Sequence, residues 1–292
     1  MDHLPYLFCD AVVGTIRTIR YQIDLFDNSR FSKWKSAFED HNSNRQKFAL
    51  CAGFVDGNWS YEFYKYNAEK GESTFYDFKT IQQLRRKYLQ IIYVVYRNYP
   101  CDKICSFEEI NEITKFISPF VNLALLELKN KQIEERDLSS LLSHFRIAQF
   151  FQINVDHYRT CYDDFLSTQI RSDLLEDVNI SGDNWPKEIQ LGLEKLVLRK
   201  SFESVCCGRS NFRFEKSFFE NLFELSKPKE AMLFEGKFSF EFKDLEEFKK
   251  DLQFRSERNC LTWKREDGVF ISVENCNVFL RISSSARFGD FH

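Results

Sequence analysis

The sequence has little of what interrupts regular structure: only 10 glycines and 5 prolines occur among its 292 residues. With 43% hydrophobic and 16% aromatic residues, it lacks the composition of a disordered chain. The few glycines are scattered, and none belongs to a GxxxxGK or GxGxxG phosphate-binding loop. We therefore expect a folded protein with a large apolar core and no cofactor.

Long apolar runs and an excess of one charge are also missing. No stretch approaches the ~20 apolar residues that span a bilayer, and residues 1–9 do not follow the order of a signal peptide. The 41 basic and 44 acidic residues are spread along the chain, which disfavours nucleic acid and membranes as partners. We expect a cytoplasmic or nuclear protein whose partners are other proteins.

The nine cysteines lack the regular framework of a small secreted domain, because their number is odd and their spacing is irregular. Cys101 and Cys105 form a CxxxC motif. Without a second pair of Cys or His residues, this motif supplies only half of a zinc site. We expect most cysteines to be buried thiols that pack like small apolar residues, and we predict no metal site.

The sequence does contain a recurring strand pattern, apolar-x-x-apolar-x-apolar, separated by amphipathic helical stripes. Alternating strands and helices indicate an α/β fold built from βαβ units. Successive copies start 27, 25 and 27 residues apart, which favours a short leucine-rich-like solenoid of helix–strand repeats over an open parallel sheet. The four clearest copies are Leu123-Leu126-Leu128, Phe150-Ile153-Val155, Leu175-Val178-Ile180 and Phe202-Val205-Cys207.

Four segments follow from these patterns. Residues 1–45 form an N-terminal helical segment, and residues 46–79 form a β-hairpin and linker, with a tight turn at Asp56-Gly57. Residues 80–240 hold the α/β repeats, whose helices include starts at the capping signals of Thr80, Ser106 and Ser217. Residues 241–292 form a charged helix and an antiparallel β-meander that caps the open end of the repeats.

One pair of residues offers a candidate for catalysis. His157 and Cys161 are four residues apart, and we expect them on one face of a helix that follows a strand, at the carboxyl edge where α/β proteins often bind ligands. The alternative is an exposed histidine at the helix start and a cysteine that packs inward. Because no third orienting group or GxSxG motif accompanies the pair, we predict that the protein is not an enzyme.

The N-terminus resembles an F-box, the helical motif that docks on the core of a ubiquitin ligase. The shared features are Leu4-Pro5, the apolar helix that follows, and Trp34 about thirty residues later. The whole chain is similar to nematode-expanded families of F-box-like proteins that carry a leucine-rich-like α/β region. Segments behind this similarity are Met1-Asp2-x-Leu4-Pro5-x-x-Phe8, Trp34-Lys35-x-Ala37, Asp56-Gly57-x-Trp59-Ser60-Tyr61, Ser118-Pro119-Phe120-Val121-Asn122-Leu123 and Trp263-Lys264-Arg265-Glu266-Asp267-Gly268-Val269.

This resemblance implies a protein-interaction adaptor that serves as a substrate receptor of a cullin-type ubiquitin ligase. The N-terminal helices would bind the small adaptor subunit of the ligase, and the repeats would bind a target protein. The alternatives are a small hydrolase-like enzyme at the carboxyl edge of the parallel strands and a purely structural scaffold. The residues expected at the ligase contact are Leu4, Pro5, Phe8, Val12 and Trp34.

Overall fold

The computed structural model describes residues 5–14, 32–67, 72–199, 202–224, 232–245, 248, 253–257, 259–265 and 268–285. The chain divides into two compact units. Unit 1 comprises Met1–Leu126 and Ser140–Phe150, and unit 2 comprises Glu127–Ser139 and Phe151–His292. Both are α/β, as the sequence predicts, and the strands form parallel and antiparallel pairs.

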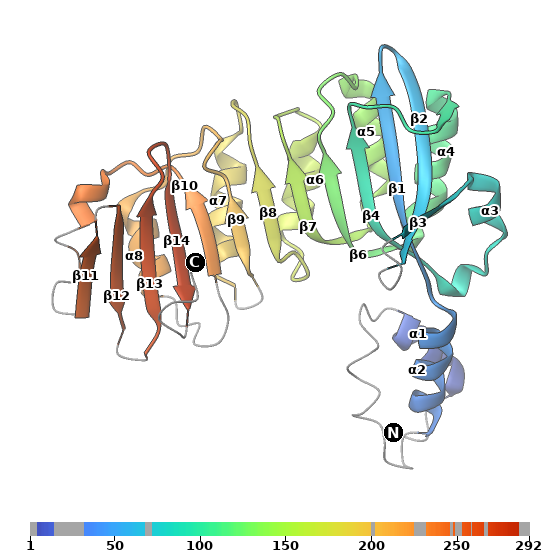
Figure 1. Ribbon diagram of the computed structural model, residues 1–292, viewed down its shortest axis with the longest axis horizontal. Helices are drawn as coiled ribbons and strands as arrows, with labels where there is room; N and C mark the ends of the chain where they lie inside the picture. Colours follow the sequence, from blue (N-terminus) through green and yellow to red (C-terminus); the bar gives the residue numbers. More distant parts are fainter. Residues whose placement is uncertain are drawn as a thin grey trace. The chain divides into compact units, whose positions relative to one another are not determined.

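Unit 1 begins with a pair of helices and continues into a small sheet (Figure 1). The sheet has the order β4-β1-β2-β3, and β5 pairs with the first part of β2 on the same edge that β3 occupies further along the strand. β1 and β4 are parallel, and β1, β2 and β3 pair antiparallel. Its elements are α1 (Tyr6–Gly14), α2 (Ser32–Asn44), β1 (Gln46–Val55), β2 (Asn58–Asn67), β3 (Glu72–Tyr76), α3 (Phe78–Gln83), η3 (Arg86–Tyr88), β4 (Leu89–Arg97), β5 (Lys103–Cys105), α4 (Phe107–Ile117) and η4 (Ser118–Phe120).

The predicted hairpin is confirmed by β1 and β2. Asp56 and Gly57 connect the two strands with φ angles of 49° and 80°, which is the left-handed backbone that a two-residue hairpin turn requires. The predicted helix start at Ser106 is also confirmed, since its Oγ accepts a hydrogen bond from the Glu109 amide. The predicted start at Thr80 is wrong, because Asp77 caps α3 and accepts a hydrogen bond from the Thr80 amide.

In unit 2, four parallel strands continue into an antiparallel meander, in the order β7-β8-β9-β10-β14-β13-β12-β11. The predicted meander is therefore present, with β14 paired to β10. The elements are β7 (Gln149–Val155), α6 (Tyr162–Ile170), β8 (Asp177–Ile180), α7 (Lys187–Val197), β9 (Ser204–Cys206), α8 (Lys216–Glu224), β10 (Met232–Gly236), η5 (Phe242–Leu245), β11 (Gln253–Glu257), β12 (Cys260–Lys264), β13 (Phe270–Asn275) and β14 (Leu280–Ser285). β6 (Val121–Leu128), α5 (Glu135–His144) and β7 each contain residues of both units, so the boundary between the units cuts through these elements.

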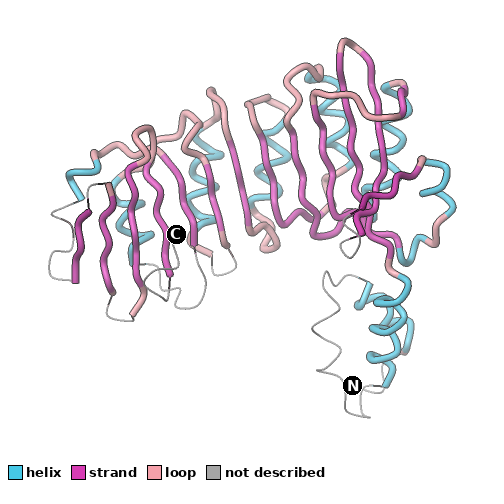
Figure 2. The backbone as a smooth tube through the Cα atoms, viewed as in Figure 1, coloured by secondary structure: helices cyan, strands magenta, loops and turns pink. Residues whose placement is uncertain are grey.

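The helices of unit 2 cover one face of its sheet (Figure 2). Side chains alternate between the two faces of a strand, so every second residue points toward the helices. The strand registers place the middle apolar residue of the sequence pattern in one continuous row, which extends into the meander. This buried row consists of Ile153, Val178, Val205, Phe234, Ile282, Val273 and Leu261, all at most 2% exposed.

The C-terminal segment differs from the sequence prediction at its start. Where the charge pattern predicts a helix over 244–252, the structure has the short 3-10 helix η5, and most of the remaining residues lie outside the described part. β3, β5 and β11 were not predicted. Among the described helices, none has both the length and the apolar character needed to cross a bilayer.

Candidate functional site

The N-terminal helices α1 and α2 pack against each other through a small apolar cluster. Cys9 and Val13 lie four residues apart on one face of α1, and they meet Ala37 and Phe38 of α2. All four side chains are at most 1% exposed. Trp34 packs against the edge of this cluster. The pair is therefore a small folded module with one packed side.

The outer side of α1 exposes two large apolar residues. Leu7 is 77% exposed and Phe8 is 48% exposed, and the Phe8 ring meets the Trp34 ring edge-on at a centroid distance of 6.2 Å. We call Leu7, Phe8 and Trp34 the α1 patch. An apolar face that solvent contacts is a feature of interaction surfaces.

Four of the five residues predicted for the ligase contact are described. Pro5 is exposed and its carbonyl accepts hydrogen bonds from the amides of Phe8 and Cys9, so it begins α1. Val12 is half-buried, and Leu4 lies outside the described residues. Sequence reasoning omitted Leu7, although its position beside Phe8 in an apolar helix could have indicated it.

A polar cluster fixes the helical pair to the beginning of β4. Lys87 Nζ lies 2.7 Å from Asp10 Oδ1 and 2.9 Å from Asp40 Oδ2, and the Tyr88 hydroxyl donates to Asp40 Oδ2 at 2.7 Å. The hydrogen bond from Tyr88, followed by that from Lys87, lowers the pKa of Asp40. Residues from α1, α2 and η3 thus share one network, so α1 has a defined position within unit 1.

His41 belongs to the same network, and it is buried. Its Nε2 lies 3.2 Å from Asp10 Oδ1, and the residue is 1% exposed. Burial is the largest effect and lowers the pKa of His41, with the Arg45 charge acting in the same direction. His41 is therefore a neutral structural residue rather than an exposed cation at a helix end.

The second candidate surface is the face of the unit 2 sheet turned away from the helices, which we call the open face. Here Arg281 Nε lies 2.7 Å from Glu235 Oε1, and Arg281 Nη1 lies 3.3 Å from Glu274 Oε2. Burial raises the pKa of Cys206 to about 11, so its thiol stays protonated near neutral pH. The strand registers align a lateral polar row composed of Asn154, Asn179, Cys206, Glu235, Arg281 and Glu274.

The expected placement of His157 and Cys161 on one helical face is wrong. α6 begins at Tyr162, Cys161 occupies its N-cap position, and His157 lies in the preceding loop. Burial raises the pKa of Cys161 to about 12 and lowers the pKa of His157 to about 4. The thiol and the imidazole are therefore both held neutral, and neither ring nitrogen of His157 has a hydrogen-bond partner in the described part of the chain.

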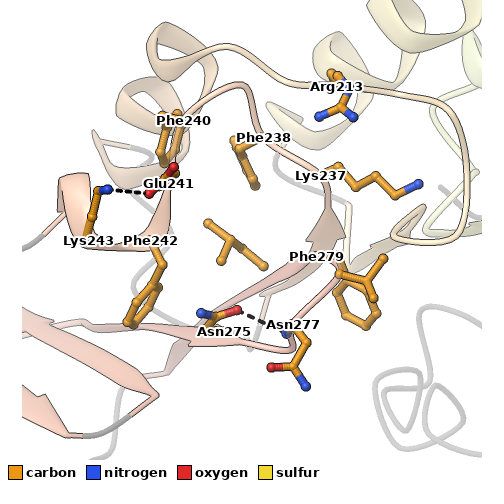
Figure 3. A pocket seen from close by; sticks show the side chains of 12 residues that line it. Arg213, Lys237, Phe238, Phe240, Glu241, Phe242, Lys243, Asn275, Asn277 and Phe279 are labelled. Carbon is orange, nitrogen blue, oxygen red and sulfur yellow. Dashed lines mark hydrogen bonds and ion pairs between the residues drawn. The ribbon is translucent and has the colours of Figure 1, made fainter.

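A cavity of about 680 Å³ does lie near the carboxyl end of β10, beside the turn between β13 and β14 (Figure 3). Its lining includes Phe240 and Phe242, the ion pair of Lys243 with Glu241 at 2.7 Å, and Lys237. Lys237 Nζ donates to the Ser210 carbonyl at 2.6 Å. Among the described residues that line this cavity there is no His, Cys or Ser.

The two cysteines of the CxxxC motif belong to different surroundings. Among the described residues, the Sγ atoms of Cys51 and Cys101 and a carboxylate oxygen of Glu62 lie within 4.8 Å of one another, and Cys105 is not part of this group. All nine cysteines are free thiols. In comparisons with known proteins, no family model, no curated protein and no solved structure matches this chain.

Proposed function

We propose that this protein is a protein-interaction adaptor that recruits a target to a cullin-type ubiquitin ligase. In this proposal the α1 patch binds the small adaptor subunit of the ligase. The open face of the unit 2 sheet binds the target. The observation that carries the proposal is the exposure of Leu7 and Phe8 on a helix whose opposite side is already packed.

The α1 patch has the properties of a docking site. Leu7 at 77% exposure and Phe8 at 48% exposure present apolar area that folding of the chain leaves in contact with water. Large apolar side chains at the centre of an interface contribute most of its binding energy. The ion pairs of Lys87 with Asp10 and Asp40 hold α1 in place, which reduces the entropy lost on binding.

The open face of the sheet suits recognition of a protein surface. β7, β8, β9 and β10 are parallel, and each is followed by a helix or 3-10 helix. This alternation supports the proposal of a leucine-rich-like repeat array. The polar row along this face offers amide, carboxylate and guanidinium groups that hydrogen-bond to a partner. The side chains of His157 and Cys161 are both neutral near pH 7, and the two residues do not lie on one face of a helix. A binding role is therefore better supported than a hydrolytic one.

The experiment is a direct binding titration with the purified adaptor subunit. Wild type is expected to bind, and Phe8→Asp is expected to weaken binding by about 30-fold or more, since loss of a central anchor costs about 2 kcal/mol or more. Ile147→Asp is the matched control, because Ile147 is 82% exposed and lies outside the helical pair. Absence of binding by folded wild type would exclude the ligase connection, and equal affinity of both variants would exclude the α1 patch as the contact.

A further inference from the structure

The segment of residues 98–102 crosses the face of the unit 1 sheet that is turned away from α4. Gly53 of β1 makes room for it, because a Cβ atom there would lie 2.3 Å from the Tyr99 carbonyl oxygen. The Cys101 amide donates to Ser60 Oγ at 2.9 Å, which fixes the segment to β2. Tyr99 is 58% exposed, whereas Cys101 is 8% exposed. The segment 98–102 thus covers part of this sheet face, and Cys101 is its buried residue.

Beneath this cover, Cys101 meets a second thiol. Cys51 of β1 lies directly opposite Glu62 of β2 in the strand register, on the same face of the sheet. Cys51 Sγ, Cys101 Sγ and a Glu62 carboxylate oxygen lie within 4.8 Å of one another. Because thiol side chains reorient by rotation about one bond, the two sulfur atoms are within reach of each other.

Arg97 places a positive charge in the same cluster. Its Nη2 lies 2.9 Å from Glu62 Oε1 and 3.5 Å from Cys101 Sγ. A guanidinium stabilises a neighbouring thiolate, whereas Glu62 restricts where the guanidinium lies. Arg97 is therefore a positioning residue for the Cys101 sulfur.

The two thiols have opposite tendencies to ionise. The hydrogen bond from Cys51 is the largest effect that lowers the pKa of Cys101, and Arg97 also lowers it, while burial opposes both. The same hydrogen bond and burial raise the pKa of Cys51. By contrast, burial raises the pKa values of Cys105 and Cys161 to about 12. The pKa of Cys101 is thus lowered while that of Cys51 is raised, so Cys101 is the thiol of this pair that ionises first.

We propose that Cys101 and Cys51 form a peroxide-sensitive dithiol, in which Cys101 is oxidised first and Cys51 then closes a disulfide between the segment 98–102 and strand β1. The Cys101 thiolate attacks one oxygen of hydrogen peroxide, the O–O bond breaks, and hydroxide leaves and is protonated to water. Cys51 sulfur then attacks the sulfenic sulfur of Cys101, the S–O bond breaks, and the hydroxyl group leaves with the Cys51 proton as a second water. Two thiols thereby lose two electrons, and one peroxide is reduced.

Trypsin separates the two cysteines, which makes the disulfide directly measurable. Cleavage after Lys47 and Lys65 gives a peptide with Cys51 as its single cysteine, and cleavage after Arg97 and Lys103 gives a peptide with Cys101 as its single cysteine. Reduced full-length protein is exposed to a small excess of hydrogen peroxide, quenched with an alkylating reagent, digested and analysed by mass spectrometry. The expected result is a linked pair of peptides 48–65 and 98–103 that reducing agent separates.

Variants assign the roles of the residues. Cys51→Ser is expected to leave Cys101 as a sulfenic or sulfinic acid, and Cys105→Ser is the control that keeps the linked peptides. Arg97→Gln is expected to slow alkylation of Cys101 at neutral pH, about tenfold for each unit by which its pKa rises. Recovery of both peptides in unlinked, alkylated form after peroxide treatment, or linkage of Cys101 to Cys105, would overturn the proposal. This outcome is independent of ligase binding, which the α1 patch titration tests.

Discussion

Lys87 Nζ lies 2.7 Å from Asp10 Oδ1, and this contact links helix α1 to the residues that lead into β4. Lys87 also contacts Asp40 of α2 at 2.9 Å, so one side chain holds both N-terminal helices. Ion pairs of Lys87 therefore connect α1 and α2 to the sheet of unit 1, in addition to the chain connection after α2. The position of the α1 patch therefore depends on this network.

Replacement of Lys87 tests that dependence. Lys87→Met is expected to increase amide hydrogen exchange across α1 and α2, because Asp10 and Asp40 lose their shared cation. Lys87 is 40% exposed, so the change in unfolding free energy should be modest, about 1 kcal/mol, and smaller at high salt. Lys103→Met is the matched control. Lys103 Nζ lies 3.5 Å from Asp77 Oδ2, and this ion pair is not part of the network of Lys87. Unchanged exchange in both helices would contradict the assigned role.

Acid is expected to destabilise the protein in a window set by its histidines. The pKa of His157 is lowered from 6.5 to about 4, and the pKa of His41 is also lowered. Below pH 6.5 the unfolded chain therefore binds more protons than the folded chain, so stability falls as the pH decreases toward about 4. Urea denaturation between pH 7 and pH 4 measures this effect. A stability that stays constant over that range would show that these histidines are not held neutral.

The burial of His157 is also expected to lower the stability of the protein at pH 7. Its two ring nitrogens are buried and have no hydrogen-bond partner among the described residues, while the ring packs edge-on against Tyr162. His157→Leu is expected to raise the unfolding free energy by about 1 kcal/mol at pH 7, because it removes buried polar atoms that lack partners. The variant should also show a weaker acid dependence in the same denaturation series. Destabilisation at pH 7 would indicate that the ring makes a stabilising polar contact.

The close approach at Gly53 gives a packing prediction. Gly53→Ala would place a Cβ atom 2.3 Å from the Tyr99 carbonyl and 2.8 Å from Ser60 Oγ, so the segment 98–102 must move. We expect a loss of about 1–3 kcal/mol in stability and faster alkylation of Cys101. Gly192→Ala is the control, because its Cβ would meet only the Ile170 side chain, at 3.2 Å, in a helix that favours alanine. Equal alkylation rates in both variants would contradict the covering role of the segment.

Substitution of two neighbouring residues of β10 tests which face of the unit 2 sheet is packed and which is open. Phe234 is fully buried and contacts the rings of Phe214 and Phe218, whereas Leu233 lies on the opposite face and is half-buried. Phe234→Ala is expected to lower the unfolding free energy by about 3–5 kcal/mol, and Leu233→Ala by about 1 kcal/mol. Chemical denaturation of both variants measures the difference. Similar losses would contradict the assignment of the open face.

Local patterns allowed much of the fold to be predicted from the sequence. Ile153, Val178 and Val205 occupy the same position in successive copies of the strand pattern, and they lie side by side in the buried row. Ser106 begins a helix because its hydroxyl bonds to an amide three residues later, an interaction that depends on adjacent chain alone. The prediction of a helix that holds both His157 and Cys161 placed the start of α6 too early, because residues in a packed loop can have the same spacing as residues in a helix.

The sequence by itself determined the α/β class, the hairpin, the parallel strands and the meander, because alternation, capping and turn residues act over short distances. The tertiary structure alone decided which distant residues meet. Cys51 and Cys101 are 50 residues apart in the chain, and no spacing rule connects them. Lys87 and Asp10 are likewise far apart in the chain, and the tertiary structure brings them to 2.7 Å. Such contacts depend on strand order and on packing between segments, which a one-dimensional pattern does not encode.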